Sequence, residues 1–258
     1  MPSRLYDDLD PLYREIWGTS LHHGLWDTGK ESPQQARDNL INLAIDLLQP
    51  RGRIADIGCG YGTLAHRLIN DFNTEIVAST ASKTQANLIK PHPSLSILTG
   101  DWLAQTLTPQ SLDGAIAVES LSHFLSFDSF LAHTVPALKI GAQIVIADWF
   151  SDNGKRPFLR HLAKSGDLPH WRSFASLTAK ARHYGLKESN SHDLSQKTAP
   201  TWSHLLLKSL SLPVRRPNLL PVLLTQLIKR PSLLWTFPLL RLAYQTGDLQ
   251  YHIVSFEK

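Results

Sequence analysis

The sequence predicts an α/β fold in which a mostly parallel sheet carries helices on both faces. Three observations support this prediction. Short apolar runs recur between residues 53 and 149, segments with helical spacing separate most of them, and glycines follow the first run. Strands that alternate with helices of this length are typical of a parallel sheet, because each crossover helix covers a face of the sheet.

A helix is predicted from Ser32 to Leu48, since its apolar residues follow helical spacing and Ser32–Pro33 is a favourable start. The apolar run 53–58 predicts a buried strand. The alternating run 249–256 predicts a final strand at an edge of the sheet. The same reasoning predicts strands at 75–79, 95–98, 112–118 and 143–149, and helices at 63–70, 82–90 and 127–138.

The pattern changes in the second half of the chain. Residues 153–193 are expected to form helices and loops, with the clearest helix at 173–184. Residues 194–247 contain no acidic residue, and within them residues 205–242 combine fifteen leucines with six lysines or arginines. Three interpretations of this leucine-rich segment stay open: an apolar lid over a hydrophobic acceptor, a surface resting on an anionic membrane, or helical core with a solvated basic rim.

The composition excludes several classes of protein. A chain of 258 residues with 42% apolar residues can bury one substantial core, so extended disorder is not expected. The net charge of +4 is too small an excess to indicate a nucleic-acid partner. The single cysteine, Cys59, excludes an intramolecular disulfide. There is no apolar signal core at the amino-terminal end and no apolar stretch of about eighteen residues, so a cytoplasmic location is expected.

A glycine-rich segment, residues 56–62 with the sequence D-I-G-C-G-Y-G, lies between a predicted strand and a predicted helix. Glycines permit a tight turn and the close approach of a ligand, and the helix start offers free N–H groups. Ligands of open α/β sheets bind at the carboxyl ends of strands, where this loop falls. The spacing lacks the last glycine of a dinucleotide fingerprint, and Asp56 suits a cationic ligand better than a pyrophosphate. A plain strand-to-helix turn is the alternative for the loop taken alone.

The glycine-rich segment resembles motif I of the class I S-adenosylmethionine-dependent methyltransferases. Residues 75–85 resemble the next motif of the tocopherol, sterol and cyclopropane-synthase-like branch. The matching residues are Thr80, Ser82 and Gln85, and the departures are Ala78 and Lys83. Residues 117–123 and 139–149 resemble the motifs around the fourth and fifth strands, and residues 13–26 resemble the lead-in of this branch. The resemblance extends over most of residues 6–204.

The resemblance implies a Rossmann-like class I methyltransferase sheet of seven strands, mostly parallel with an antiparallel last strand, and a helical cap. It also divides the chain into four parts. These are residues 1–30 as an N-terminal cap segment, 31–152 as the cofactor-binding α/β core, 153–247 as a helical substrate cap, and 248–258 as the last strand of the core sheet.

The resemblance further implies the residues that hold S-adenosylmethionine, which becomes S-adenosylhomocysteine on methyl transfer. Asp101 is expected to accept a hydrogen bond from the adenine amine, and Trp102 to stack on the ring, with core packing as the alternative for Trp102. The residues expected to contact the cofactor are Asp56, Gly58, Cys59, Gly60, Gly62, Thr80, Ser82, Gln85, Asp101, Trp102 and Glu119. The residues expected to line the acceptor pocket are Tyr13, Trp17, His22, Trp149 and Trp171.

Methyl transfer requires positioning and, for some acceptors, the removal of a proton. A base near neutral pH is most simply a histidine, and His123, directly after the fourth strand, is expected to face the sulfonium. His23 is the second choice, in a segment expected to close over the pocket. Either histidine could instead orient a loop or the substrate. No histidines are spaced as H-E-x-x-H, so no metal is expected, and Cys59 has no evident base beside it that would make it a nucleophile.

These expectations combine into a soluble enzyme that moves a methyl group to carbon, oxygen or nitrogen of a small lipophilic acceptor, such as a terpenoid, prenylquinol, polyketide or alkaloid-like compound. Three alternatives stay open: a cyclisation or rearrangement on the same fold, a non-catalytic binding protein, and a nicotinamide oxidoreductase, which the glycine spacing disfavours. Membrane contact, if residues 205–242 make it, would be peripheral. Neither the acceptor nor the oligomeric state is encoded in the motifs.

Overall fold

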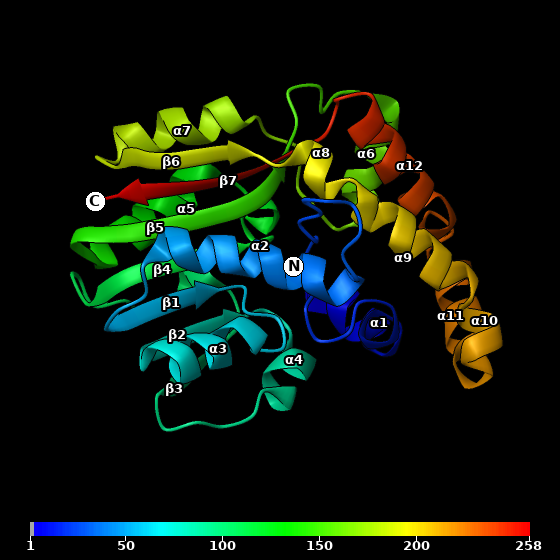
Figure 1. Ribbon diagram of the computed structural model, residues 1–258, viewed down its shortest axis with the longest axis horizontal. Coiled ribbons are helices and arrows are strands. Elements are labelled where there is room, and N and C mark those ends of the chain that lie inside the picture. The colour runs from blue at the N-terminus through cyan, green and yellow to red at the C-terminus, as the bar shows by residue number, and fades with distance from the viewer. Residues whose placement is uncertain (1–2) are drawn as a thin grey trace.

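A seven-stranded sheet forms the centre of the molecule (Figure 1). The computed structural model describes residues 3–258, with side chains from residue 6 onward. The strands are β1 (Arg53–Ile57), β2 (Glu75–Thr80), β3 (Leu95–Thr99), β4 (Leu112–Val118), β5 (Leu138–Phe150), β6 (Lys187–Asp193) and β7 (Gln250–Glu257). They lie in the order β3-β2-β1-β4-β5-β7-β6, and only β7 runs antiparallel to its neighbours. The predicted seven-stranded, mostly parallel sheet with an antiparallel last strand is confirmed.

Two layers of helices cover the sheet. One layer contains α2 (Pro33–Leu48) and α3 (Thr63–Phe72), and the other contains α5 (Phe127–Thr134) and α7 (Phe174–His183). Successive residues of a strand point to opposite faces. Ile54 of β1 therefore joins the core under α2 and α3, whereas its neighbour Ala55 joins the core under α5 and α7.

The predicted helix after Ser32 forms because its first turn is capped in both directions. The Ser32 hydroxyl accepts a hydrogen bond from the backbone N–H of Gln35 at 3.2 Å, and the Gln35 side chain accepts one from the Ser32 N–H at 2.9 Å. Pro33 occupies the first helical position, where its missing N–H is not needed. A cap of this kind stabilises a helix by roughly 1 kcal/mol.

The last strand is not at an edge of the sheet, so the predicted edge position is wrong. β7 lies between β5 and β6, and its Tyr251 and Phe256 are fully buried. The edge strand is β6, with Lys187 opposite Glu257 of β7. The sequence of β6, K-E-S-N-S-H-D, has no apolar residue and remains largely exposed, so it carries no strand pattern. Backbone pairing with β7 holds it in place.

The fifth strand begins earlier than predicted. The helix expected over 127–138 ends at Thr134, a 3-10 turn η3 (Val135–Ala137) follows, and β5 begins at Leu138. Pro136 has no backbone N–H with which to continue the α-helix. The first part of β5 is the half-exposed segment around Gly141, which lacks the apolar character of the run 143–149.

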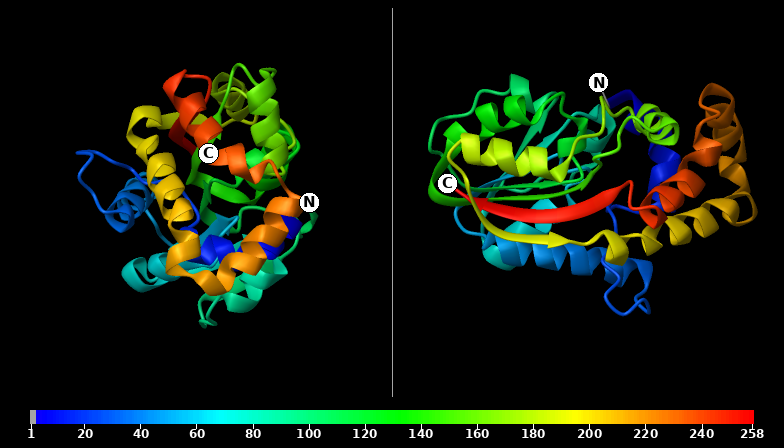
Figure 2. Two further views of the ribbon diagram at one scale, coloured as in Figure 1. Left: turned by 90° about the vertical axis from the view of Figure 1, so that its right-hand side faces the viewer. Right: turned by 90° about the horizontal axis from the view of Figure 1, so that it is seen from above.

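The helical cap stands at the carboxyl ends of the parallel strands (Figures 1 and 2). It contains α1 (Ser3–Ile16), α6 (Pro157–Ser165), α8 (Ser195–Thr198), α9 (Pro200–Leu210), α10 (Leu212–Arg215), the 3-10 turn η4 (Pro217–Leu219), α11 (Leu220–Lys229) and α12 (Leu233–Gln245). The expectation of one helical cap over 153–247 needs correction, because α7 and β6 interrupt it and pack on the sheet. Among the helices of residues 3–258, none has the length and apolar character needed to cross a membrane.

Candidate active site at the carboxyl ends of the strands

The loop between β1 and α3 is shaped by three glycines with positive φ: Gly58 at 81°, Gly60 at 55° and Gly62 at 74°. A Cβ at Gly58 would lie 2.3 Å from Cβ of Ser120, and one at Gly62 would lie 2.9 Å from Ile89. A Cβ at Gly60 would meet no atom within 4 Å. Two of the glycines therefore allow close packing, and Gly60 leaves its backbone open to an approaching molecule.

A cleft lies over this loop. The segment between α1 and α2 forms one wall, and the glycine loop with the adjoining part of α3 forms the other. Among its lining residues are Thr19, Ser20, Leu21, His22, Asp56, Gly58, Cys59, Gly60, Tyr61 and Val118. Four of the residues expected to contact the cofactor thus line a single opening.

Asp56 supplies an unpaired acceptor at the floor of this cleft. The residue is 3% exposed, and its Oδ2 atom has no hydrogen-bond partner. Burial raises the pKa of Asp56 to about 7, although a hydrogen bond from the Ala65 backbone opposes the rise. Buried carboxylates without a partner are costly, and a cationic or N–H-donating ligand would supply the missing partner.

The polar side chains after β2 satisfy one another. Thr80 Oγ1 donates to Gln85 Oε1 at 2.7 Å, and Ser82 N donates to Thr80 Oγ1 at 3.2 Å. Ser82 Oγ donates to the carboxylate of Asp7 on α1 at 2.5 Å. All three predicted residues are buried, so they hold the turn after β2 and anchor α1 above it.

The expected stacking role of Trp102 is wrong. Its ring is 3% exposed, belongs to the core under α5, and donates from Nε1 to Thr134 Oγ1 at 2.9 Å. Asp101 remains exposed at the start of the 3-10 turn η1 (Trp102–Ala104), where its carboxylate accepts from the Leu103 N–H at 3.0 Å. The alternative of core packing holds for Trp102, and Asp101 stays accessible at the sheet edge.

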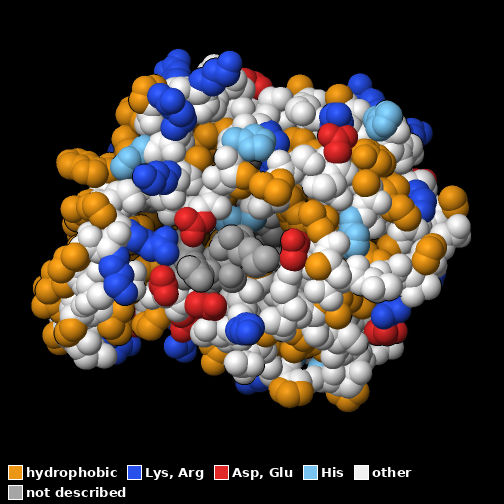
Figure 3. Space-filling view, turned by 180° about the vertical axis from the view of Figure 1, so that it is seen from behind, with side chains coloured by type: hydrophobic (Ala, Val, Ile, Leu, Met, Phe, Trp, Pro, Cys, Tyr) orange, Lys and Arg blue, Asp and Glu red, His pale blue; other side chains and the backbone are white. Residues whose placement is uncertain are grey.

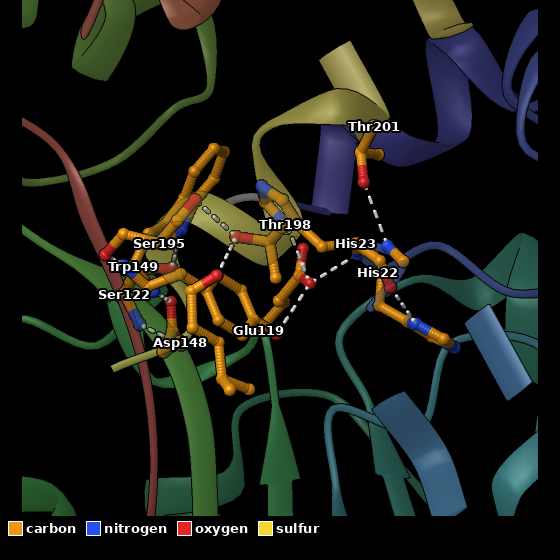
Figure 4. Close-up of polar contacts among 12 residues, drawn as sticks. His22, His23, Glu119, Ser122, Asp148, Trp149, Ser195, Thr198 and Thr201 are labelled. Carbon is orange, nitrogen blue, oxygen red and sulfur yellow. Dashed lines mark hydrogen bonds and ion pairs between the residues drawn. The ribbon is translucent and has the colours of Figure 1, made fainter. Parts of the chain in front are cut away.

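Glu119 pairs with a histidine instead of lining the cofactor cleft (Figure 4). Its Oε1 accepts from the backbone N–H of His23 at 2.6 Å, lies 2.9 Å from His23 Nδ1, and accepts from the Tyr251 hydroxyl at 2.9 Å. On the other side of the ring, His23 Nε2 lies 3.0 Å from the Tyr244 hydroxyl. We call these four residues the His23 network. These contacts hold Oε1 of Glu119, and the expected contact of Glu119 with the cofactor stays a prediction.

The protonation states within the His23 network follow from its burial. Burial raises the pKa of Glu119, but the charge and hydrogen bonds of His23 outweigh this effect and hold the pKa below its ordinary value. Burial also raises the pKa values of Tyr244 and Tyr251 far above normal. The ionised Glu119 can only accept hydrogen bonds, so His23 Nδ1 donates to it, and Nε2 lies within hydrogen-bond distance of the Tyr244 hydroxyl, which keeps its proton. Every polar atom of the His23 ring has a partner.

His123 lies in the 3-10 turn η2 (Leu121–His123) directly after β4. Its Nε2 atom is 2.9 Å from the hydroxyl of Tyr6 on α1, and its Nδ1 atom has no partner. Burial lowers the pKa of His123 to about 4, against a smaller opposing effect of Glu119. Because burial raises the pKa of Tyr6, its hydroxyl keeps its proton and can donate a hydrogen bond to the neutral imidazole in the tautomer that leaves Nε2 unprotonated.

Four tryptophans pack together beside the His23 network. The rings of Trp149 and Trp202 stack at 5.8 Å and 5°, and Trp171 stands perpendicular to Trp149 at 5.6 Å. Trp17 meets Trp202 edge-on at 5.8 Å, and His23 meets Trp202 edge-on at 4.7 Å. We call Trp17, Trp149, Trp171 and Trp202 the tryptophan cluster. It brings together three of the five residues predicted for the acceptor pocket.

The other two predicted pocket residues lie elsewhere. Tyr13 packs on Tyr6 with ring centroids 5.8 Å apart, on the inner side of α1. His22 Nδ1 contacts the backbone oxygen of His23 at 2.8 Å, and its side chain lines the glycine-loop cleft. His22 is therefore placed on the cofactor side and does not join the tryptophan cluster.

Asp148 is a buried acid that the sequence reasoning did not single out. Its Oδ2 accepts from the Ser122 N–H at 3.0 Å, and burial raises its pKa to about 7. Trp149 Nε1 donates to the Ser122 hydroxyl at 3.0 Å, so Asp148 and Ser122 together fix one wall of the tryptophan cluster (Figure 4). An acid just before the end of an apolar strand run was the available signal. Other site residues that were not predicted are Tyr6, Trp202, Tyr244 and Tyr251.

No protein-family model matches the chain. The probable chloroplastic tocopherol O-methyltransferase of Oryza sativa subsp. japonica is 24% identical over 80% of this chain. The match spans 65% of the rice protein's length, just under two thirds. The chloroplastic tocopherol O-methyltransferase of Arabidopsis thaliana is also 24% identical, over 99% of this chain and 81% of the relative. A 24-methylenesterol C-methyltransferase of the same plant is 23% identical over 80% of this chain and 62% of the relative.

Solved structures share the fold over nearly the whole chain. A mycolic acid cyclopropane synthase complexed with S-adenosylhomocysteine has a TM-score of 0.86 at 16% identity, covering 100% of this chain and 97% of its own. The cyclase SpnF has a TM-score of 0.80 at 21% identity, covering 99% and 95%. The solved structures show that the chain has the fold of the class I S-adenosylmethionine-dependent methyltransferases, and its sequence is similar to the tocopherol and sterol methyltransferases.

Proposed function

We propose that this protein methylates carbon, oxygen or nitrogen of a small lipophilic acceptor. One observation carries the proposal: the glycine-loop cleft with its unpaired Asp56 oxygen and the tryptophan cluster both lie at the carboxyl ends of the central strands. A polar cradle beside an aromatic wall suits a charged methyl donor and an apolar acceptor held in one site.

Asp56, Gly58 and Gly60 would hold the cofactor. The unpaired Asp56 carboxylate complements the positive charge of S-adenosylmethionine, and the open backbone at Gly60 permits close approach. Asp101, exposed after β3, is the proposed partner of the adenine amine. The bound cofactor supplies an electrophilic methyl group on its sulfonium. The contribution of the chain is to orient the two reactants and to exclude water.

The tryptophan cluster would shape the acceptor side. Its rings are apolar and, apart from the partly exposed Trp149, buried, so an acceptor would approach the cluster at Trp149. Trp149 Nε1 is already used by Ser122 and Trp171 Nε1 by the backbone of Leu159, whereas Trp202 Nε1 has no partner. Such walls favour a ring system or an isoprenoid chain over a sugar or an amino acid. Tocopherol and sterol in the names of the sequence relatives fit the same class.

His123 is the proposed general base for an acceptor that loses a proton. Its lowered pKa keeps it neutral at physiological pH, and its Nε2 atom lies within hydrogen-bond distance of the Tyr6 hydroxyl, where the Nδ1–H tautomer offers a lone pair. An acceptor hydroxyl taking the place of the Tyr6 hydroxyl would meet the same lone pair. His23 is less suited to this role, because Glu119 and Tyr244 occupy both of its ring nitrogens. We assign His23 the role of a positioning residue.

A second candidate function is a cyclisation or rearrangement without methyl transfer. The structural similarity to the cyclase SpnF favours it. The two functions differ in one product, because only methyl transfer releases S-adenosylhomocysteine. Formation of S-adenosylhomocysteine in step with acceptor consumption supports the methyltransferase. A rearranged product with intact S-adenosylmethionine supports the cyclase.

The first experiment is a calorimetric titration of the purified protein with S-adenosylmethionine and, separately, with nicotinamide dinucleotides. We expect binding of S-adenosylmethionine alone. Asp56→Asn should weaken it about tenfold to a hundredfold, since a hydrogen bond to a charged group contributes roughly 1.5–3 kcal/mol. The control is Asp46→Asn, an exposed acid on α2, which should bind as the wild type does. Equal affinity of the folded Asp56→Asn protein would refute the proposed cofactor placement.

A further inference from the structure

The outer side of the cap exposes large apolar side chains at helical spacing. Nine of the thirteen exposed large apolar side chains among the described residues fall within residues 207–242. They are Leu207, Leu210 and Val214 on α9 and α10, Leu220, Leu224 and Ile228 on α11, and Leu234, Trp235 and Leu242 on α12. We call these nine residues the outer apolar face. Their concentration in one segment distinguishes it from the singly scattered apolar residues of an ordinary surface.

The spacing shows that whole helix faces are exposed. Leu220, Leu224 and Ile228 recur every four residues and therefore lie on one side of α11, with Ile228 81% exposed. The opposite side of the same helix turns inward, where Gln226 is buried and Leu223 packs on the core. This surface helix therefore has apolar residues on both its inner and its outer side. Contact of the outer side chains with water is unfavourable, so burial of that side against a partner would be favourable.

The charged residues within the segment that bears the outer apolar face all have one sign. Residues 194–247 contain no acidic residue. Within the described part of the chain, Arg215 and Arg216 pair with Glu15 of α1, and Arg230 pairs with Asp8 and Asp167. These contacts fasten the cap to its neighbours.

Three cations of the segment take no part in those ion pairs. Lys208, Lys229 and Arg241 stand on the helices that bear the outer apolar face, and no salt bridge is formed by any of them within residues 3–258. In the view from behind, apolar and basic side chains gather over the cap at the left (Figure 3). Exposed apolar side chains that share their helices with unpaired cations match the chemistry of an anionic phospholipid surface, where acyl chains lie beneath negative headgroups.

The same helices connect this face to the site. Trp202 of the tryptophan cluster stands on α9, which carries Leu207 on its outer side. Phe237 of α12 contacts Trp202 with ring centroids 6.1 Å apart, and Trp235 on the same helix is 62% exposed. We propose that the outer apolar face docks the protein on the headgroup region of an anionic phospholipid bilayer, with the cap side of the site turned toward the lipid.

A second copy of the chain is a poorer occupant of this face. Symmetric pairing would bring the same patch together on both subunits. Lys229 and Arg241 of one copy would then approach the like charges of the other, without an acidic residue in the segment to offset them. Like-charge contacts of this kind disfavour association.

The test is co-sedimentation of the full chain with vesicles. One set contains phosphatidylglycerol mixed with phosphatidylcholine, and the other contains phosphatidylcholine alone. We expect binding to the anionic vesicles at least about fivefold tighter than to the neutral ones, weakening as salt is added. Ile228→Glu and Lys229→Glu should each lower the affinity at least about fivefold, because each places a negative charge on the docking face.

Matched controls sit at the opposite end of the sheet. Ile140→Glu changes an apolar residue that is 77% exposed, and Lys187→Glu changes an exposed lysine at the start of β6. Both should bind anionic vesicles as the wild type does. Equal binding to both vesicle types, or equal losses in test and control variants, would overturn the proposal.

Self-association provides a further outcome. Concentration-dependent dimers in light scattering that Ile228→Glu abolishes, without vesicle binding, would assign the face to a second copy and also overturn the proposal. The vesicle assay needs neither cofactor nor turnover, so its failure would leave the proposed methyl transfer untouched.

Discussion

The hydroxyl of Tyr6 lies 2.9 Å from Nε2 of His123, although 117 residues separate the two in the chain. Tyr6 belongs to α1, and His123 follows the central strand β4, so the contact ties the cap to the sheet at the centre of the candidate site. It also places a neutral hydroxyl against a neutral imidazole, which is the arrangement a general base needs before it takes a proton.

His123→Gln tests this role. The glutamine can still accept a hydrogen bond from Tyr6 but cannot take a proton near neutral pH. For an oxygen or nitrogen acceptor, we expect turnover to fall by about 10²–10⁴, with unchanged affinity for S-adenosylmethionine in calorimetry. His183→Gln, an exposed histidine at the end of α7, should retain full turnover. Undiminished turnover of His123→Gln would remove the base role.

Wild-type turnover should also depend on pH in a specific way. Because the pKa of His123 is lowered to about 4, the imidazole is already neutral above roughly pH 5. We expect the His123-dependent rate to rise through about pH 4 and to stay level from pH 6 to 8. A rise centred near pH 6.5 would show that the ring titrates as an exposed histidine does during turnover.

Comparing Gly60→Ala with Gly141→Ala distinguishes a loss of cofactor binding from a loss of stability through backbone strain. Gly60 has a φ of 55° and open space where a Cβ would stand, and Gly141 has a φ of 75° with equally open space. Alanine at either position should lower the free energy of unfolding by about 1 kcal/mol, because both force a side chain into the left-handed region. Only Gly60→Ala should weaken S-adenosylmethionine binding in calorimetry. Equal affinity in the two variants would argue that the cofactor does not approach this backbone.

Short-range signals explain what the sequence predicted well. The capping box at Ser32 and the glycines at 58, 60 and 62 act on neighbouring residues, so their consequences can be derived from a few positions. The apolar runs of β1, β2 and β4 likewise carry their own evidence of burial. Strand β6 has none of these signals, because its polar residues are ordered only by pairing with β7.

Long-range packing explains what was missed or misjudged at the site. Oε1 of Glu119 is held by His23, 96 residues away, and by Tyr251, 132 residues away, a pairing that its place after a strand did not predict. Trp102 was expected to stack on adenine, but its ring lies in the core, where Nε1 donates a hydrogen bond to Thr134 of α5. A residue type and its place after a strand indicate that it lies near the site. Which way the side chain turns depends on partners that local sequence does not reveal.

The buried Asp148 gives the last prediction, which concerns stability. Its folded pKa is about 7, above the value of 3.8 for an unperturbed aspartate, and burial is the largest cause. A raised folded pKa means that the native state holds its proton more tightly than the unfolded state does. The stabilisation is therefore complete below about pH 4 and is lost as pH rises toward 7.

Asp148→Asn removes this titration while keeping the shape of the side chain. Between pH 5 and pH 8, the wild type should lose roughly 2 kcal/mol of unfolding free energy relative to Asp148→Asn, measured by urea denaturation at both pH values. Comparing the change between two pH values cancels any constant cost of the amide facing the Ser122 N–H. Asp152→Asn, an exposed acid four residues further on, should follow the wild type at both pH values. Parallel pH profiles for wild type and Asp148→Asn would mean that Asp148 ionises as readily in the folded protein as in the unfolded chain.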